Sequence, residues 1–170
     1  MQEFIEPHPA TLPLDDLLSQ CKSRRQRRSG PGGQHRNKVE TAVAYTHIPT
    51  GVTAMASERR VQEENRKQAL FRLRVRLALN VRSPARCNPS ACWTERVQAQ
   101  RITISKYHDD FPAMLSEALD YVMQGQGDLQ GFCDLIGCSK SQLVKFFKLD
   151  PSALQGVNDL RHQYGHHTLR

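Results

Sequence analysis

The chain has 170 residues, of which 38% are apolar, and a formal net charge of +7 with a pI of about 9.4. This length accommodates one domain of ordinary size and a small second one, with a core that needs no disulfides. The basic excess favours a polyanionic partner, nucleic acid above all, over a small neutral ligand. No apolar run reaches the roughly 18 residues of a membrane span, so we expect neither export nor membrane insertion.

Residues 13–21 predict a short helix, because leucines at helical spacing follow a proline and two aspartates stand in the first turn. Residues 29–33 contain so many loop formers that they exclude a helix or a central strand. From residue 39 to 48, β-branched and aromatic residues alternate with others, which predicts a strand. Residues 49–51 then predict a tight connection, and residues 52–56 predict the returning strand of a hairpin.

A long helix is predicted from a capping Ser57 to about Val81, with leucines in one stripe and arginines on the opposite face. Residues 83–100 are expected to be irregular, and their Trp93 is expected to be a packing anchor. Residues 101–104 predict one further short strand.

The last part of the chain has a helical pattern. Residues 111–122 share a broad apolar face, and residues 128–148 predict two short helices around Gly137, the second capped by Ser139. This helix-turn-helix spacing occurs in DNA-binding proteins, where exposed lysines contact phosphates, and equally in helical domains that only pack or bind proteins. The lysines concerned are Lys140, Lys145 and Lys148.

The predicted fold class is α+β, with a small mixed sheet and a long packing helix, followed by an all-helical region. We place a boundary near residue 105, which gives domains of residues 1–105 and 106–170.

Basic charge is concentrated in the N-terminal part. Residues 1–100 hold 17 Lys and Arg against 9 Asp and Glu, whereas residues 101–170 hold 7 against 8. Seven of these cations fall in a stretch without any acid: Lys22, Arg24, Arg25, Arg27, Arg28, Arg36 and Lys38. Counterion release from a nucleic acid would give such a stretch much of its affinity, while a solvated basic loop explains the same charges.

The five cysteines predict free thiols. They are odd in number, none forms a C-x-x-C pair, and the spacing of the Cys87/Cys92 and Cys133/Cys138 pairs does not suit zinc. We therefore expect no metal and no other cofactor, in a reducing compartment. The cytoplasm is the expected location, with an organellar matrix as the alternative.

The segment from Arg28 to Lys38, with the sequence RSGPGGQHRNK, resembles the signature loop of class I peptide-chain release factors and related ribosome-rescue peptidyl-tRNA hydrolases. The resemblance covers about residues 12–82. It continues through the sequence HIPTG at residues 47–51, through Arg60-Val61-Gln62, and through Asn65, Lys67 and Ala69 on a helix, in the order and spacing of the family. The chain departs from the usual pattern at Arg36, where a small apolar residue is common, and at Val61, where serine is.

The resemblance implies hydrolysis of the ester of peptidyl-tRNA in the ribosomal peptidyl transferase centre, with Gly32, Gly33 and Gln34 as the catalytic residues. Glycines lack Cβ atoms, so the backbone can lie against RNA and direct the Gln34 N–H at the oxyanion of the tetrahedral intermediate. The Gln34 side chain is an amide and cannot act as a general base, so we expect it to shape the water site. The family also makes Gln34 a candidate for methylation.

The partners implied are large-subunit rRNA and peptidyl-tRNA. Residues around the tripeptide and at the start of the long helix are predicted to bind RNA. For each of the cations among them, the alternative interpretation is an ordinary surface charge without a binding role. They are Arg27, Arg28, Ser29, Gly30, Pro31, His35, Arg36, Asn37, Lys38, Arg59, Arg60, Arg66 and Lys67. His35 is interpreted as a phosphate or base contact rather than a general base.

We find no codon-recognition domain in the sequence, which predicts a codon-independent rescue factor that acts on stalled ribosomes. The helical region is expected to recognise a stalled state or to bind a protein partner, and we expect a monomer. The alternatives are a non-catalytic module that binds the ribosome or rRNA and, third, a helix-turn-helix regulator of nucleic acid.

Overall fold

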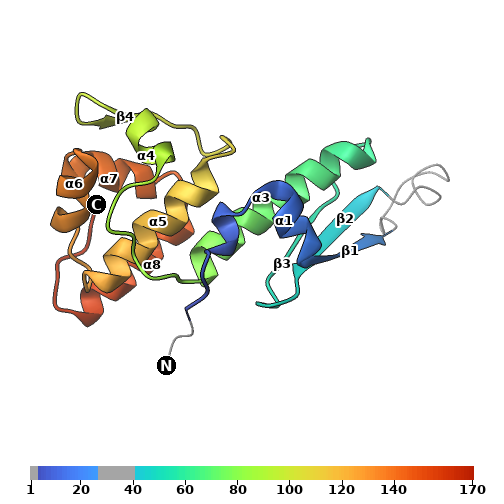
Figure 1. The fold of residues 1–170 in the computed structure, drawn as a ribbon, viewed down its shortest axis with the longest axis horizontal. Coiled ribbons are helices and arrows are strands. Elements are labelled where there is room, and N and C mark those ends of the chain that lie inside the picture. The colour runs from blue at the N-terminus through green and yellow to red at the C-terminus, as the bar shows by residue number, and fades with distance from the viewer. Residues whose placement is uncertain (1–3, 27–40) are drawn as a thin grey trace.

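The structure is a computed structural model that describes residues 4–26 and 41–170. Its sheet lies at one end of an elongated molecule and most of the helices at the other, with the long helix α3 between them (Figure 1). The elements of the sheet end are the 3₁₀ turn Pro9–Thr11, α1 (Leu14–Ser19), β1 (Cys21–Gln26), β2 (Ala42–His47), β3 (Thr53–Ala56) and α3 (Gln62–Asn80). The predicted first helix therefore ends earlier than expected, because Cys21 begins a strand.

The three strands form an antiparallel sheet in the order β1-β2-β3, so the sheet among the described residues is not mixed as predicted. The short connection between β2 and β3 favours antiparallel pairing. In the central strand β2, Val43, Tyr45 and His47 are buried while Ala44 and Thr46 are partly exposed, as the alternating pattern predicts. The hairpin to β3 is confirmed, and its turn ends at Gly51, whose φ of +70° favours glycine.

Helix α3 begins at Gln62, and the predicted start at Ser57 is wrong. The reason is a tertiary contact: the buried side chain of Asn65 accepts from the N–H of Arg59 and donates to the Arg59 carbonyl. These bonds hold the chain before α3 in a non-helical conformation. The predicted apolar stripe is confirmed, because Leu70, Leu73 and Leu77 are all buried.

The segment after α3 is less irregular than predicted. It contains the short helix α4 (Ala91–Arg96) and the antiparallel pair β4 (Val97–Gln98) and β5 (Arg101–Ile102). Trp93 is fully buried, and its ring lies edge-on to Phe132 at 5.2 Å and to Phe146 at 5.1 Å between centroids. Its predicted role as a packing anchor is confirmed.

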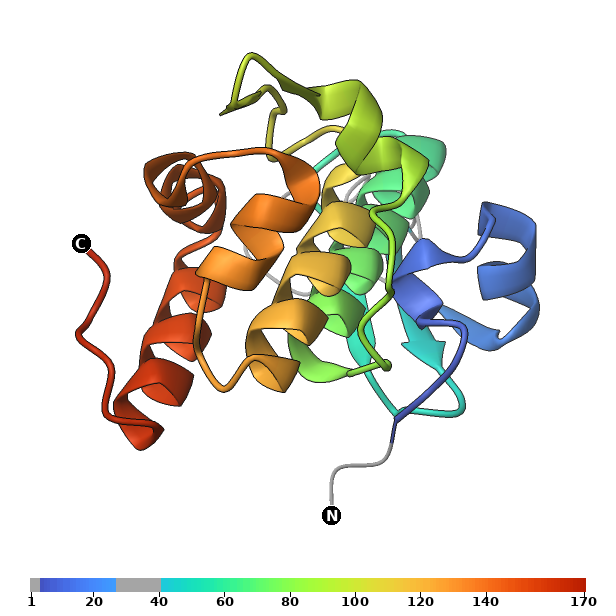
Figure 2. The same cartoon turned by 60° about the vertical axis from the view of Figure 1, so that its left-hand side comes forward.

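Four helices complete the fold: α5 (Phe111–Gln124), α6 (Gln130–Ile136), α7 (Lys140–Phe147) and α8 (Pro151–Gln163). The turn between α6 and α7 contains Gly137 at φ +70°, as its sequence predicted. Ser139 stands at the N-cap of α7, but its hydroxyl bonds Ser141 at 3.0 Å and caps no backbone N–H. Helix α8, which the sequence patterns did not predict, packs beside α5 (Figure 2).

The α+β class is confirmed. Helix α3 packs on β2 and β3 with one side and on α5 with another, so the buried apolar residues form one continuous cluster from Ala10 to Val157. The boundary near residue 105 stays a prediction. None of the described helices is both long and apolar enough to cross a bilayer.

Candidate active site

The predicted catalytic tripeptide belongs to the connection between β1 and β2. Most of this connection, residues 27–40, lies outside the described residues. The predicted site residues that fall there are Gly32, Gly33 and Gln34 together with Arg27, Arg28, Ser29, Gly30, Pro31, His35, Arg36, Asn37 and Lys38. The described residues show how the two ends of the connection are held.

Both ends of the connection lie at the same end of the β1–β2 pair, because Gln26, the last residue of β1, pairs with Ala42, the first residue of β2. The C-terminal end of the connection, directly before β2, is also bound to α3. The side-chain nitrogen of Asn65 donates to the carbonyl of Thr41 at 2.8 Å, across 24 positions in sequence. Asn65 is fully buried, and its amide makes three hydrogen bonds to main-chain groups at Thr41 and Arg59.

Asn65 thereby brings the start of α3 next to the end of the connection. A buried amide with both its oxygen and its nitrogen in use is strongly constrained, since any rotation would leave main-chain groups unpaired. Sequence reasoning included Asn65 only as part of a family pattern and missed this role. The available signal was an asparagine in the first turn of a helix without a capping side chain.

The four predicted RNA contacts on described residues, Arg59, Arg60, Arg66 and Lys67, are all exposed. The Arg59 guanidinium lies 3.9 Å from Glu64 and that of Arg66 lies 3.7 Å from Glu63. Such exposed pairs are weak and leave the arginines able to bind phosphate. Because the main chain of Arg59 is bonded to Asn65, the structure places this arginine beside the end of the connection.

Strand β1 adds basic residues to the same end of the molecule. It is an edge strand, and Lys22, Arg24 and Arg25 on it are exposed. The sequence predicted their charge but not that they lie on a strand. Charged side chains on an edge strand also disfavour pairing with another chain, which is an ordinary structural role for them.

The hairpin end of β2 is held by His47. Its Nδ1 lies 2.8 Å from the Thr50 hydroxyl and its Nε2 lies 3.0 Å from the Gln20 amide oxygen. Burial lowers the pKa of His47. Its ring joins the turn to Gln20, which follows the last residue of α1. Within residues 4–26 and 41–170, no three His, Cys, Asp or Glu side chains lie close enough to bind a metal.

The arrangement is a sheet and helix that hold both ends of a glycine-rich connection and surround its start and end with cations. A family model for the RF-1 domain matches residues 18–109, just over half of the chain. The chain belongs to the RF-1 domain family. It is a class I release factor-like protein, and the resemblance seen in its sequence is confirmed.

Curated relatives match part of the chain. Peptide chain release factor 1 of Anaplasma phagocytophilum is 35% identical over 120 residues, which are 65% of this chain and 33% of that protein. Peptide chain release factor 1 of Symbiobacterium thermophilum is 51% identical over 74 residues, or 44% of this chain and 21% of that protein. Peptide chain release factor 2 of Paramagnetospirillum magneticum is 48% identical over 67 residues, or 39% and 18%. The RF-1 domain protein thus spans at most about a third of the length of these relatives.

Proposed function

We propose that this protein hydrolyses the ester of peptidyl-tRNA on the ribosome without reading a stop codon. The observation that supports it is the Gly32-Gly33-Gln34 sequence within a connection that the RF-1 domain fold holds at both ends, through the β1–β2 pairing and through Asn65. A basic surface surrounds those ends. The relatives are named release factors, and an intact tripeptide favours catalysis over simple occupation of the ribosome.

The proposed chemistry needs two things from this chain. A main-chain N–H at Gln34 stabilises the oxyanion as water attacks the ester, and removal of one such donor costs about 2.7–4 kcal/mol in other enzymes. Small residues at positions 32 and 33 let the main chain approach that close. The Gln34 amide orients the water, and its methylation, which mass spectrometry would detect, would adjust that contact.

Codon independence is proposed from the region that lies beyond the matched domain. After residue 109, the chain forms the four helices α5–α8, which carry slightly more acid than base. We propose that this region recognises a stalled ribosome or a separated large subunit, alone or through a protein partner. Deletion of residues 106–170 with unaltered ribosome binding would contradict that role.

The test is release of labelled peptide from peptidyl-tRNA on ribosomes with an empty decoding site, a sense codon or a stop codon. Wild type should release in all three states, and Gly33→Ala should reduce the rate by about 100-fold or more. Gly131→Ala on α6 is a matched control, because an added Cβ there meets no atom within 4 Å. Release restricted to the stop codon would overturn codon independence. Ribosome binding without any release would instead favour the non-catalytic alternative.

A further inference from the structure

Two adjacent hollows lie along α3 where the loop before α5 passes it. The first has a volume of about 440 Å³ and the second of about 420 Å³. Three side chains line both of them: Gln68 and Phe71 from α3, and Tyr107 from the loop. The two hollows are therefore adjacent, and two of the three side chains that they share, Phe71 and Tyr107, are aromatic.

Tyr107 is largely exposed, at 70% of its full surface. One exposed ring is ordinary on a protein surface. Tyr107 is distinguished by its position, because it lines both hollows. The Lys106 ammonium lies 4.9 Å from the centre of its ring, which adds a cation beside the aromatic face.

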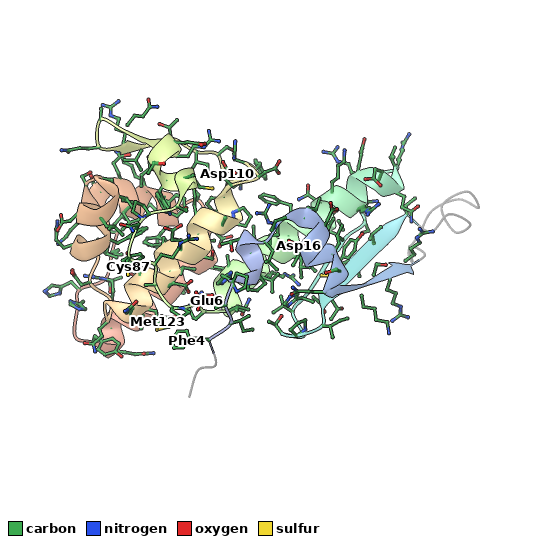
Figure 3. The ribbon with its side chains drawn as sticks, viewed as in Figure 1. Phe4, Glu6, Asp16, Cys87, Asp110 and Met123 are labelled. Atoms are coloured by element: carbon green, nitrogen blue, oxygen red, sulfur yellow. The ribbon has the colours of Figure 1, made fainter. Side chains whose placement is uncertain are left out.

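The loop that bears Tyr107 is firmly attached to the fold. The Arg74 guanidinium of α3 donates to the carbonyl of Asp109 at 3.0 Å and to that of Ala10 at 3.1 Å. Asp110, at the N-terminal end of α5 (Figure 3), accepts from Arg96 at 2.8 Å. The exposed ring thus projects from a loop fixed at α3 and at α5, so a ligand would meet a partly preorganised site.

Cations predominate around the hollows. Those that line them are Arg59, Lys67, Arg72, Arg76 and Lys106, against three acids, Glu64, Asp109 and Asp150. Some of these groups are already engaged on both sides. Glu64 lies near Arg59, and Arg72 pairs with Glu58 at 2.8 Å. Arg76 donates one N–H to the Thr53 carbonyl, and Asp150 accepts from main-chain N–H groups at the start of α8. Outside the two ion pairs, Lys67, Arg76 and Lys106 stand against Asp109 and Asp150. The electrostatic balance favours an anionic ligand.

We propose that these hollows bind two consecutive nucleotides of an unpaired RNA strand. Tyr107 stacks on a base, the Gln68 amide contacts a base edge, and Lys67, Arg76 and Lys106 contact the phosphates. An exposed aromatic ring set among Arg and Lys is the combination that binds single strands. An acidic peptide would satisfy the cations, but it would make less use of a planar ring and an adjacent amide.

The position of the site agrees with this choice. Arg59 and Lys67, which line the first hollow, belong to the surface assigned to rRNA in the proposed function. The proposal rests on the proposed function in one respect, which is that the bound RNA is an unpaired segment of rRNA. Strand binding itself can be measured without ribosomes and without hydrolysis.

The first experiment uses a mixed-sequence RNA octamer that contains 2-aminopurine, titrated with the full-length protein. Stacking on Tyr107 should quench the fluorescence, and Tyr107→Phe should preserve the quenching. Tyr107→Ala should abolish it and weaken binding by roughly 5- to 150-fold. Tyr164→Ala is the matched control, because Tyr164 is a 49% exposed tyrosine that lines neither hollow. Equal quenching by wild type and Tyr107→Ala would overturn the proposal.

The basic β1–β2 region could also bind the octamer, so a second experiment locates the strand. RNA with 4-thiouridine is cross-linked by light and the attached peptides are identified by mass spectrometry. Cross-links at residues 68–71 or 106–107 support the proposal, whereas cross-links confined to residues 22–38 overturn it. Displacement of the RNA from wild type and Tyr107→Ala alike by an acidic peptide of equal charge would also overturn it.

Failure of this proposal is distinguishable from failure of the proposed hydrolysis. Gly33→Ala should bind and quench the octamer as the wild type does, even though its release activity is lost. Conversely, a protein that releases peptide but neither quenches nor cross-links at Tyr107 would retain the proposed function and lose the strand site.

Discussion

The sheet region, residues 4–82, and the helical region, residues 83–170, differ in the contacts that dominate their centres. In the sheet region, buried polar side chains fix particular main-chain groups, as Asn65 does at Thr41 and Arg59, or join one element to the next, as His47 does at Gln20 and Thr50. In the helical region, the centre is a group of aromatic rings around Trp93, although Asp120 and Glu117 also accept there from the N–H groups of Ser83 and Ser90. Among the described residues, only in the first region do such polar contacts hold the end of the β1–β2 connection. Variants in each region should therefore fail in different ways.

The largest effect on stability is expected from Trp93→Ala in the helical region. It removes a fully buried ring and its contacts with Phe132 and Phe146, which should lower the free energy of unfolding by about 3–5 kcal/mol. Urea denaturation followed by circular dichroism measures it, with Tyr164→Ala as the exposed control. Because the buried cluster is continuous, one shared transition is expected. Two separate transitions would contradict that expectation and support a boundary near residue 105.

The second variant, Asn65→Ala, should lose activity out of proportion to its stability. It leaves main-chain groups at Thr41 and Arg59 without their partner, which should cost about 2–3 kcal/mol of stability. The end of the connection that contains the proposed tripeptide is then no longer bound to α3, so peptide release by the folded protein should fall at least tenfold.

The helical region offers a matched control for this variant. Asn158 on α8 also bonds the main chain at a distant residue, accepting from the N–H of Leu169 and donating to its carbonyl. Asn158→Ala should cost less stability, because Asn158 is only half-buried and makes two such bonds where Asn65 makes three, and it should leave release unchanged. If both variants reduced release equally under conditions where each is folded, the special role of Asn65 would be disproved.

Sequence patterns predicted the elements whose own residues decide their conformation. Alternation gave β2, the leucine stripe gave most of α3, and Gly137 marked the turn between α6 and α7. Helix α8 was also within reach, because Asp150 caps its first turn ahead of a proline and Ala153 and Val157 form a buried stripe.

The remaining features depend on contacts between distant residues. The start of α3 was misplaced because Asn65, not Ser57, determines where the helix begins. Helix α4 is six residues long and is stabilised chiefly by the burial of Trp93, so local propensity gave no indication of it. At the candidate site, the cations could be predicted from composition, but the bond from Asn65 to Thr41 could not. The charge of a residue can be read from the sequence directly, whereas the position of a loop end depends on contacts with residues far away in the sequence.

The smallest expected effect concerns the joint between the two regions, a hollow of about 290 Å³ that His8 and Asp120 both line. His8 comes from the N-terminal segment, two residues after Glu6, which Figure 3 labels, and Asp120 comes from α5. Burial lowers the pKa of His8 to about 4, with Arg82 acting in the same direction. Burial raises the pKa of Asp120 to about 7 and Glu117 adds to this, against the Ser83 N–H and Arg82.

The lowered pKa of His8 and the raised pKa of Asp120 make the free energy of unfolding depend on pH in opposite directions. The contribution of His8 is present above its ordinary pKa of 6.5 and is lost as pH falls through about 4, because the unfolded chain takes up the proton first. That of Asp120 is fully present below 3.8 and is lost as pH rises through about 7, because the folded protein keeps the proton longer. Between pH 4 and 6.5 the two slopes oppose each other, so the wild type should change little in this window.

Single variants at the joint should separate the two slopes. Asp120→Asn should leave a stability that rises from pH 4 to 6.5 through His8, and His8→Gln should leave one that falls from pH 4 to 7 through Asp120, each by on the order of 1 kcal/mol. Urea midpoints measured at half-unit steps of pH give both curves. Parallel curves for wild type and both variants would show that neither group titrates differently on folding. Opposite slopes would show that His8 in one region and Asp120 in the other make opposing pH-dependent contributions to the free energy of unfolding.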